Sequence, residues 1–297
     1  MRTFLTLAAS LLLAYASFAA DPGYTRKEDV VYGRKFGTAL TLDVFTPEKQ
    51  NGAAILFMVS GGFYSAHEAI NPAFYKEFLA RGYTVFAVVH GSQPRFVIHE
   101  ITEDIHRAVR FARHNAKQFG VDPQKFGITG ASAGGHLTLT LCTQGKPGPA
   151  QARDPIDRES SVVQAGACYF PPTDFLNYGK PGEDAVGVGI LKDFKGAFGA
   201  GAETAESRQA YGKEISPIYF ISKSTAPVLI IHGDADKLVP YQQAEVFIEK
   251  LKAEGVDAEL INRPGKEHGW PDILNDQKIL ADWFDKHLLG KTAPKQP

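Results

Sequence analysis

The stretch KFGITGASAGGHLTLTL, residues 125–141, places one serine, Ser132, among small residues between a β-like run and a helix-like run. Gly130 to Gly134 matches G-x-S-x-G, the pattern of a sharp strand-to-helix turn that projects a nucleophilic serine. The residues two before and two after such a serine approach each other closely, so both must be small. The bare pattern is common, but its strand and helix flanks favour Ser132 as a nucleophile over an idle serine in a tight turn.

A serine hydroxyl needs a base, and in this fold the order along the chain is serine, acid, histidine. Of the nine histidines, His268 and His287 follow the last plausible acid. His268 lies in a loop, RPGKEHGWP, whereas His287 lies within a helical pattern, so His268 is the predicted base. The stretch HGDADKLVP resembles the H-G-x-x-D-x-x-V-P signature of serine hydrolases and predicts Asp236 as the acid, with Asp234 as the alternative.

The tetrahedral intermediate of such a reaction needs hydrogen-bond donors for its oxyanion. The N–H of Ala133, at the start of the helix after the serine, is one expected donor. The loop FMVSGGFYSAHEAI, residues 57–70, supplies Gly61 and Gly62 as further expected donors, because glycine lets backbone N–H groups approach a substrate. An ordinary Gly-Gly turn is the alternative for this loop.

Aromatic residues near the expected strand ends could form an apolar substrate pocket, although ordinary packing is the alternative for each one. The selected candidates are Phe63, Tyr64, Phe170 and Trp270.

Strand-like and helix-like stretches alternate along the chain, which predicts an α/β fold with a mainly parallel sheet and helices on both faces. We expect about eight strands, of which the first two are antiparallel. Residues 20–290 form one predicted domain, in which the Gly- and Pro-rich segment 171–225 is a cap-like insertion over the sheet. Residues 291–297 are expected to be a disordered tail.

The first 19 residues have one positive charge, an apolar run and small residues at positions 17 and 19, which is the layout of a secretory signal peptide. We therefore expect a secreted or periplasmic protein without a stable membrane anchor; an uncleaved anchor is the alternative. The net charge of −1 gives no indication of nucleic-acid binding. Cys142 and Cys168 are either buried free thiols or a disulfide.

These residues resemble the α/β-hydrolase superfamily, and within it the secreted bacterial carboxylesterases grouped with feruloyl and acetyl-xylan esterases (BD-FAE-like) and the hormone-sensitive-lipase-like esterases. The pieces that carry the resemblance are SGGF, GYTVFAVVHGS, EDIHRAVRFARHNAKQFGVDPQKFGITGASAGGHL, HGDADKLVP and EHGW. The chain departs from this branch at Val59 and Ser60, where a histidine and a glycine are usual, and at HGSQPRF, where relatives often carry a tyrosine-arginine pair.

The resemblance implies the same catalytic and oxyanion residues, a small-molecule or polysaccharide ester as substrate, and no metal or cofactor. Three alternatives share some of these features. A prolyl-oligopeptidase-like peptidase would need a propeller domain for which this chain has no room. A dienelactone-type lactone hydrolase usually has cysteine where this chain has Ser132. The third is a binding protein on an inactive hydrolase fold.

Overall fold

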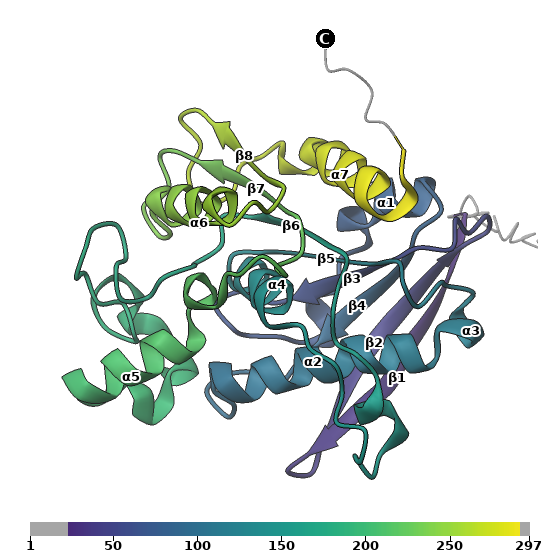
Figure 1. Ribbon diagram of the computed structural model, residues 1–297, viewed down its shortest axis with the longest axis horizontal. Helices are drawn as coiled ribbons and strands as arrows, with labels where there is room; N and C mark the ends of the chain where they lie inside the picture. Colours follow the sequence, from purple (N-terminus) through teal and green to yellow (C-terminus); the bar gives the residue numbers. More distant parts are fainter. Residues whose placement is uncertain (1–22, 292–297) are drawn as a thin grey trace, which may run out of the picture.

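An eight-stranded sheet organises the computed structural model, which describes residues 23–291 (Figure 1). The strands are β1 (Tyr24–Lys35), β2 (Thr38–Pro47), β3 (Ala54–Val59), β4 (Thr84–Val89), β5 (Phe126–Ala131), β6 (Ala165–Tyr169), β7 (Val228–Gly233) and β8 (Ala258–Arg263). Their order in the sheet is β1-β2-β4-β3-β5-β6-β7-β8. The pairs β1–β2 and β2–β4 are antiparallel and all the others are parallel, which confirms the predicted sheet.

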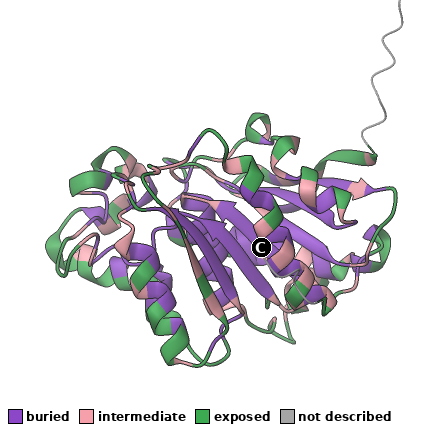
Figure 2. Ribbon diagram, turned by 90° about the horizontal axis from the view of Figure 1, so that it is seen from above, coloured by how far each residue is buried: buried purple, intermediate pink, exposed green. Residues whose placement is uncertain are grey.

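Helices cover both faces of the sheet, so the strands are buried between them (Figure 2). The α-helices are α1 (Lys76–Ala80), α2 (Ile98–His114), α3 (Ala116–Phe119), α4 (Ala133–Gln144), α5 (Ala205–Ile215), α6 (Gln242–Ala253) and α7 (Gln277–Leu289). Side chains of α1 and α7 belong to one hydrophobic core, and those of α2, α4 and α6 belong to the other.

The two cores explain why the central strands read as unbroken apolar runs. In β3, Leu56 and Met58 point into the core beneath α2 and α4, whereas Ile55 and Val59 point into the core beneath α1 and α7. A strand that is covered on both faces needs apolar residues at successive positions rather than at alternate ones. The parallel strands also place their carboxyl ends at a single edge of the sheet, where loops can meet.

The segment 171–225 follows β6 and contains short 3-10 helices and α5. Its Leu176, Val186 and Phe198 are buried in the same core as α2 and α4, so it packs onto the sheet domain.

Cys142 and Cys168 are both buried and unpaired. The predicted signal peptide, residues 1–19, and nearly all of the predicted tail, residues 291–297, lie outside the described residues. Within 23–291, no helix has the length and apolarity to cross a membrane.

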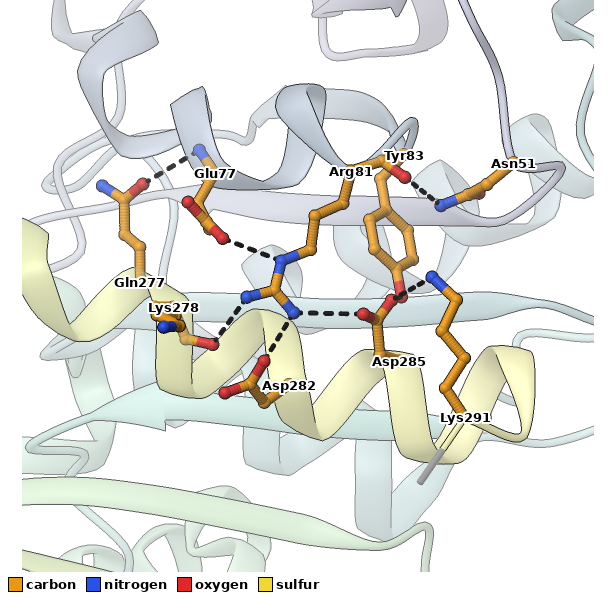
Figure 3. Close-up of polar contacts among 9 residues, drawn as sticks. All are labelled: Asn51, Glu77, Arg81, Tyr83, Gln277, Lys278, Asp282, Asp285 and Lys291. Atoms are coloured by element: carbon orange, nitrogen blue, oxygen red, sulfur yellow. Dashed lines mark hydrogen bonds and ion pairs between the residues drawn. The ribbon is translucent and has the colours of Figure 1, made fainter. Parts of the chain in front are cut away.

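Arg81, which caps α1, connects this helix to α7 near the end of the chain (Figure 3). Its guanidinium donates to Glu77 of α1 over 2.8 Å, and to Asp282 and Asp285 of α7 over 2.6 and 3.1 Å. Asp285 also accepts a hydrogen bond of 2.8 Å from the Tyr83 hydroxyl, just before β4. This network fixes the position of α7, the helix that follows the loop containing His268.

Replacing Arg81 by alanine should lower the free energy of unfolding by about 2 kcal/mol, because the half-buried carboxylates of α7 lose a charged hydrogen-bond partner. Chemical denaturation would measure the change. Lys125→Ala removes one partner of an exposed ion pair with Asp122 and should change stability by less than about 0.5 kcal/mol. Equal effects of the two substitutions would contradict the stabilising role of the Arg81 network.

Candidate active site

Ser132 lies at the turn between β5 and α4, with φ of 55° and ψ of −120°. A residue other than glycine rarely adopts a positive φ, and such strain is concentrated at functional sites. A methyl group added at Gly130 would lie 2.5 Å from the carbonyl oxygen of Gly134. A methyl group at Gly134 would lie 2.7 Å from the carbonyl oxygen of Met58, so the fold requires both glycines that the sequence pattern singled out. The Ser132 N–H donates to the carbonyl of Tyr169 over 3.0 Å, which ties the turn to β6.

The three predicted catalytic residues meet at the carboxyl edge of the sheet. The Nε2 atom of His268 lies 2.9 Å from the Ser132 Oγ, and its Nδ1 lies 2.7 Å from Oδ2 of Asp236. Ser132 follows β5, Asp236 follows β7 and His268 follows β8. The parallel sheet therefore brings together side chains that are up to 136 positions apart. The order of contacts is that of a serine activated by a histidine that a carboxylate orients.

Four N–H groups converge on the Asp236 carboxylate. Its Oδ1 accepts from the N–H groups of Leu238 and Val239, each over 2.9 Å, and its Oδ2 accepts from His268 and His232. Burial by itself raises the pKa of Asp236, but the hydrogen bonds from His232, His268 and Val239 outweigh it and hold this pKa well below its ordinary value. The carboxyl group is therefore ionised and ready to stabilise an imidazolium.

His232, at the end of β7, was not predicted from the sequence. Its fully buried ring places Nε2 at 3.2 Å from Asp236 Oδ2 and at 3.0 Å from the carbonyl oxygen of Val239. Both partners are acceptors, so Nε2 carries the hydrogen. This histidine shares Oδ2 of Asp236 with His268, and its place as the first residue of HGDAD is the one signal that could have identified it.

The alternative acid and base lie outside this chain of contacts. Asp234 accepts hydrogen bonds from Asn262 over 3.0 Å and from the N–H of Gly265 over 2.6 Å, so it joins two loops. His287 is on α7, where its ring packs against Trp283 with centroids 4.3 Å apart. The geometry therefore selects Asp236 and His268.

Two of the three expected oxyanion donors have free N–H groups in the described part of the chain. Ala133 and Gly62 line a cavity beside Ser132, and neither N–H has a hydrogen-bond partner there. The Gly61 N–H, however, donates to the carbonyl of Tyr64 over 3.0 Å in a small turn. The expectation for Gly61 is therefore corrected, because the turn occupies its donor.

Gln93 holds the loop that presents Gly62. Its side-chain amide donates to the carbonyl of Gly62, and its backbone N–H donates to the carbonyl of Phe63 over 3.2 Å. This buried glutamine lies in HGSQPRF, the stretch in which the sequence departs from its relatives. The residue Gln93 in this divergent stretch therefore holds the loop beside Ser132 in place through hydrogen bonds.

The cavity beside Ser132 is narrow and largely apolar. The volume open to the centre of a water molecule is about 20 Å³, slightly above the roughly 10–15 Å³ that one water requires. Its wall consists of Gly62, Phe63, Ser132, Ala133, Pro172, Tyr178, Leu191, Phe194, Phe198, Leu238 and Val239. Many of these residues belong to the segment 171–225, which therefore forms one side of the pocket.

Of the four predicted pocket residues, only Phe63 lines this cavity. Tyr64 is 52% exposed and points to solvent. Phe170 and Trp270 are buried behind His268: the Phe170 ring contacts the imidazole with centroids 4.5 Å apart, and the Trp270 ring lies 5.7 Å from Phe170. Phe170 therefore packs against the predicted base, and neither Phe170 nor Trp270 is part of the described wall of this cavity.

One group of carboxylates and imidazole, formed by Glu28, Asp43 and His67, has the spacing of a metal site within the described residues. The guanidinium of Arg26 already fills it, at 3.1 Å from Glu28 and 2.5 Å from Asp43. An arginine there balances the buried Asp43 charge, so the group is better explained as an ion-pair network.

The sheet, the strained serine and its hydrogen-bonded partners define an α/β-hydrolase with a serine-histidine-aspartate site. The sequence model of the BD-FAE family matches residues 42–251, and the chain belongs to this family. The chain is also similar to the probable carboxylic ester hydrolase LipM of Mycobacterium tuberculosis, at 27% identity over 77% of this chain and 52% of that protein. It thus spans about half the length of that relative.

Solved structures support the same fold. A truncated form of a carbohydrate esterase from gut microbiota superposes with a TM-score of 0.75 at 24% identity, covering 91% of this chain and 99% of that one. Esterase 2 of Thermogutta terrifontis, a planctomycete, superposes with a TM-score of 0.68 at 27% identity, covering 93% and 96%.

Gly130→Ala should lower the unfolding free energy by about 2 kcal/mol, because the new methyl group overlaps the Gly134 carbonyl and displaces the turn. Chemical denaturation would measure the effect. Gly61→Ala is the matched control for stability, since a methyl group there meets no atom within 4 Å. A Gly130→Ala protein as stable as the wild type would refute the steric requirement.

The low pKa of Asp236 makes a pH-dependent contribution to stability. The unfolded aspartate has an ordinary pKa of about 3.9, so on acidification it takes up a proton before the folded one does. The stability that Asp236 contributes is therefore complete above about pH 5 and is lost as the pH falls towards the lower folded pKa. Denaturation at pH 6, 5, 4 and 3 should show the wild type's advantage over Asp236→Asn shrinking in acid; a constant difference would contradict this.

Proposed function

We propose that this protein hydrolyses carboxylic esters through a covalent acyl-enzyme on Ser132. The observation that carries the proposal is the continuous contact from Ser132 Oγ through both nitrogens of His268 to Asp236. Membership of the BD-FAE family and similarity to a probable carboxylic ester hydrolase support it.

In the first step, His268 accepts the Ser132 proton through Nε2 while Oγ attacks the ester carbonyl. The N–H groups of Ala133 and Gly62 stabilise the oxyanion, aided by the positive end of α4. Asp236 stabilises the positive charge of the His268 imidazolium, which then protonates the leaving alcohol. In the second step, His268 activates a water molecule that attacks the acyl-enzyme, and the released acid frees Ser132.

The proposed natural substrates are acylated sugars of plant polysaccharide, with acetyl favoured over feruloyl. The similarity to a carbohydrate esterase fold is consistent with a sugar ester, and the narrow cavity favours a short acyl group unless Phe194 or Leu191 moves. Export by the predicted signal peptide, residues 1–19, would bring a secreted or periplasmic enzyme to such substrates.

Ser132→Ala should reduce kcat/KM on p-nitrophenyl acetate by at least about a thousandfold, because it removes the nucleophile but keeps the fold. Equal rates for the wild type and this variant would refute the proposal and favour a binding protein on a hydrolase fold.

Acyl length provides a separate test of the cavity. Acetate and propionate esters should exceed octanoate esters in kcat/KM by at least about tenfold, since the cavity has no room for a long chain. Acetylated and feruloylated xylan, measured beside the simple esters, test the sugar proposal. Release of ferulate but not of acetate would contradict the preference for a short acyl group.

A further inference from the structure

Tyr178, a residue of the cavity wall, carries a hydroxyl that the fold leaves without a partner in the described chain. The residue is 1% exposed, and its hydroxyl is buried without a hydrogen-bond partner within the described chain. It lines the same cavity as Ser132 and Ala133. Leaving a buried hydroxyl unpaired costs about 1–3 kcal/mol, so such a group in a native site calls for a ligand or another explanation.

The cavity is on the acyl side of the site. Ser132, Ala133 and Gly62, which would hold the carbonyl carbon and its oxyanion, belong to its wall, whereas His268 does not belong to the described wall. The leaving alcohol must be next to His268 Nε2 in order to receive its proton. The alcohol therefore departs past the partly exposed histidine, and the acyl chain enters the cavity.

The position of Tyr178 is fixed by neighbours on both sides. Its N–H donates to the carbonyl of Glu183 over 2.9 Å, and its ring is stacked on Phe175 with an interplanar angle of 3°. The preceding carbonyl, of Asn177, accepts from the buried Gln243 side chain over 3.0 Å. These contacts fix the backbone and the ring of Tyr178, so its hydroxyl would pay little ordering cost on binding a ligand.

We propose that Tyr178 is a specificity-determining residue of the acyl pocket, whose hydroxyl hydrogen-bonds an oxygen atom on a short acyl chain. Hydroxyacyl and alkoxyacyl groups would then be preferred over hydrocarbon acyl groups of the same size. Burial, and secondarily the nearby Asp236 carboxylate, raise the pKa of Tyr178 well above its ordinary value, which keeps the phenol protonated as a donor. This inference rests on the proposed ester hydrolysis.

The test compares two esters of nearly equal size, phenyl glycolate and phenyl propionate, with the wild type and Tyr178→Phe. The ratio of their kcat/KM values cancels effects common to both substrates. Tyr178→Phe should lower the glycolate-to-propionate ratio by about threefold to tenfold, the loss expected for one hydrogen bond. An unchanged ratio would overturn the proposal.

Tyr169→Phe is the matched control, because Tyr169 is 3% exposed, also has a buried unpartnered hydroxyl, and is not part of the described cavity wall. It should leave the ratio unchanged; an equal shift would show that the effect does not come from the cavity. Thermal melting distinguishes a structural role of the Tyr178 hydroxyl from a role in substrate binding, since removing an unpaired hydroxyl should not lower the Tm. A Tyr178→Phe protein that melts many degrees lower or does not fold would overturn the proposal. Wild-type rates no higher than those of Ser132→Ala would instead refute ester hydrolysis itself.

Discussion

The close approach of Gly130 and Gly134 beneath Ser132 is the constraint on which the rest of the site depends. It allows β5 to turn directly into α4 while the serine keeps a positive φ. This geometry lifts Oγ above the sheet edge and sets the Ala133 N–H at the free end of the helix. The loops after β7 and β8 need only reach the same edge to complete the site.

Charge at this edge is controlled by hydrogen bonds to a single carboxylate. Asp236 is buried, yet four N–H groups keep it ionised, and two of them come from the rings of His232 and His268. A positive charge on His268 would therefore have a fixed negative partner beside it, and the Phe170 ring packs against the imidazole. Such preorganised groups stabilise developing charge without rearrangement.

The parts of this site that follow local chain rules were predictable from the sequence. The small residues around Ser132 and the aspartate of HGDADKLVP determine their own local geometry, and the parallel sheet then brings His268 to them. Gly61 was wrongly assigned because the partner of its N–H, the Tyr64 carbonyl, depends on a turn that composition does not specify. His232 was hidden within the apolar run of a buried strand.

The pocket was less predictable for another reason. Leu191 and Phe194 lie on the 3-10 helix Gly189–Ala197 and Phe198 lies beside it; its period of three residues matches neither the α-helix nor the β-strand period. Aromatic residues near strand ends, such as Phe170 and Trp270, face either a pocket or the core, and sequence alone does not distinguish these directions. The side of the cavity formed by 171–225 therefore required the structure.

Covalent labelling tests most directly whether Ser132 is the activated nucleophile. Paraoxon should place one diethyl phosphoryl group on the peptide that contains Ser132, and the proposed ester hydrolysis should be lost in proportion to this label. Peptide mapping by mass spectrometry, with residual activity measured on the same samples, would show both. Loss of activity with the label on a different residue, or full activity after complete labelling of Ser132, would contradict the account.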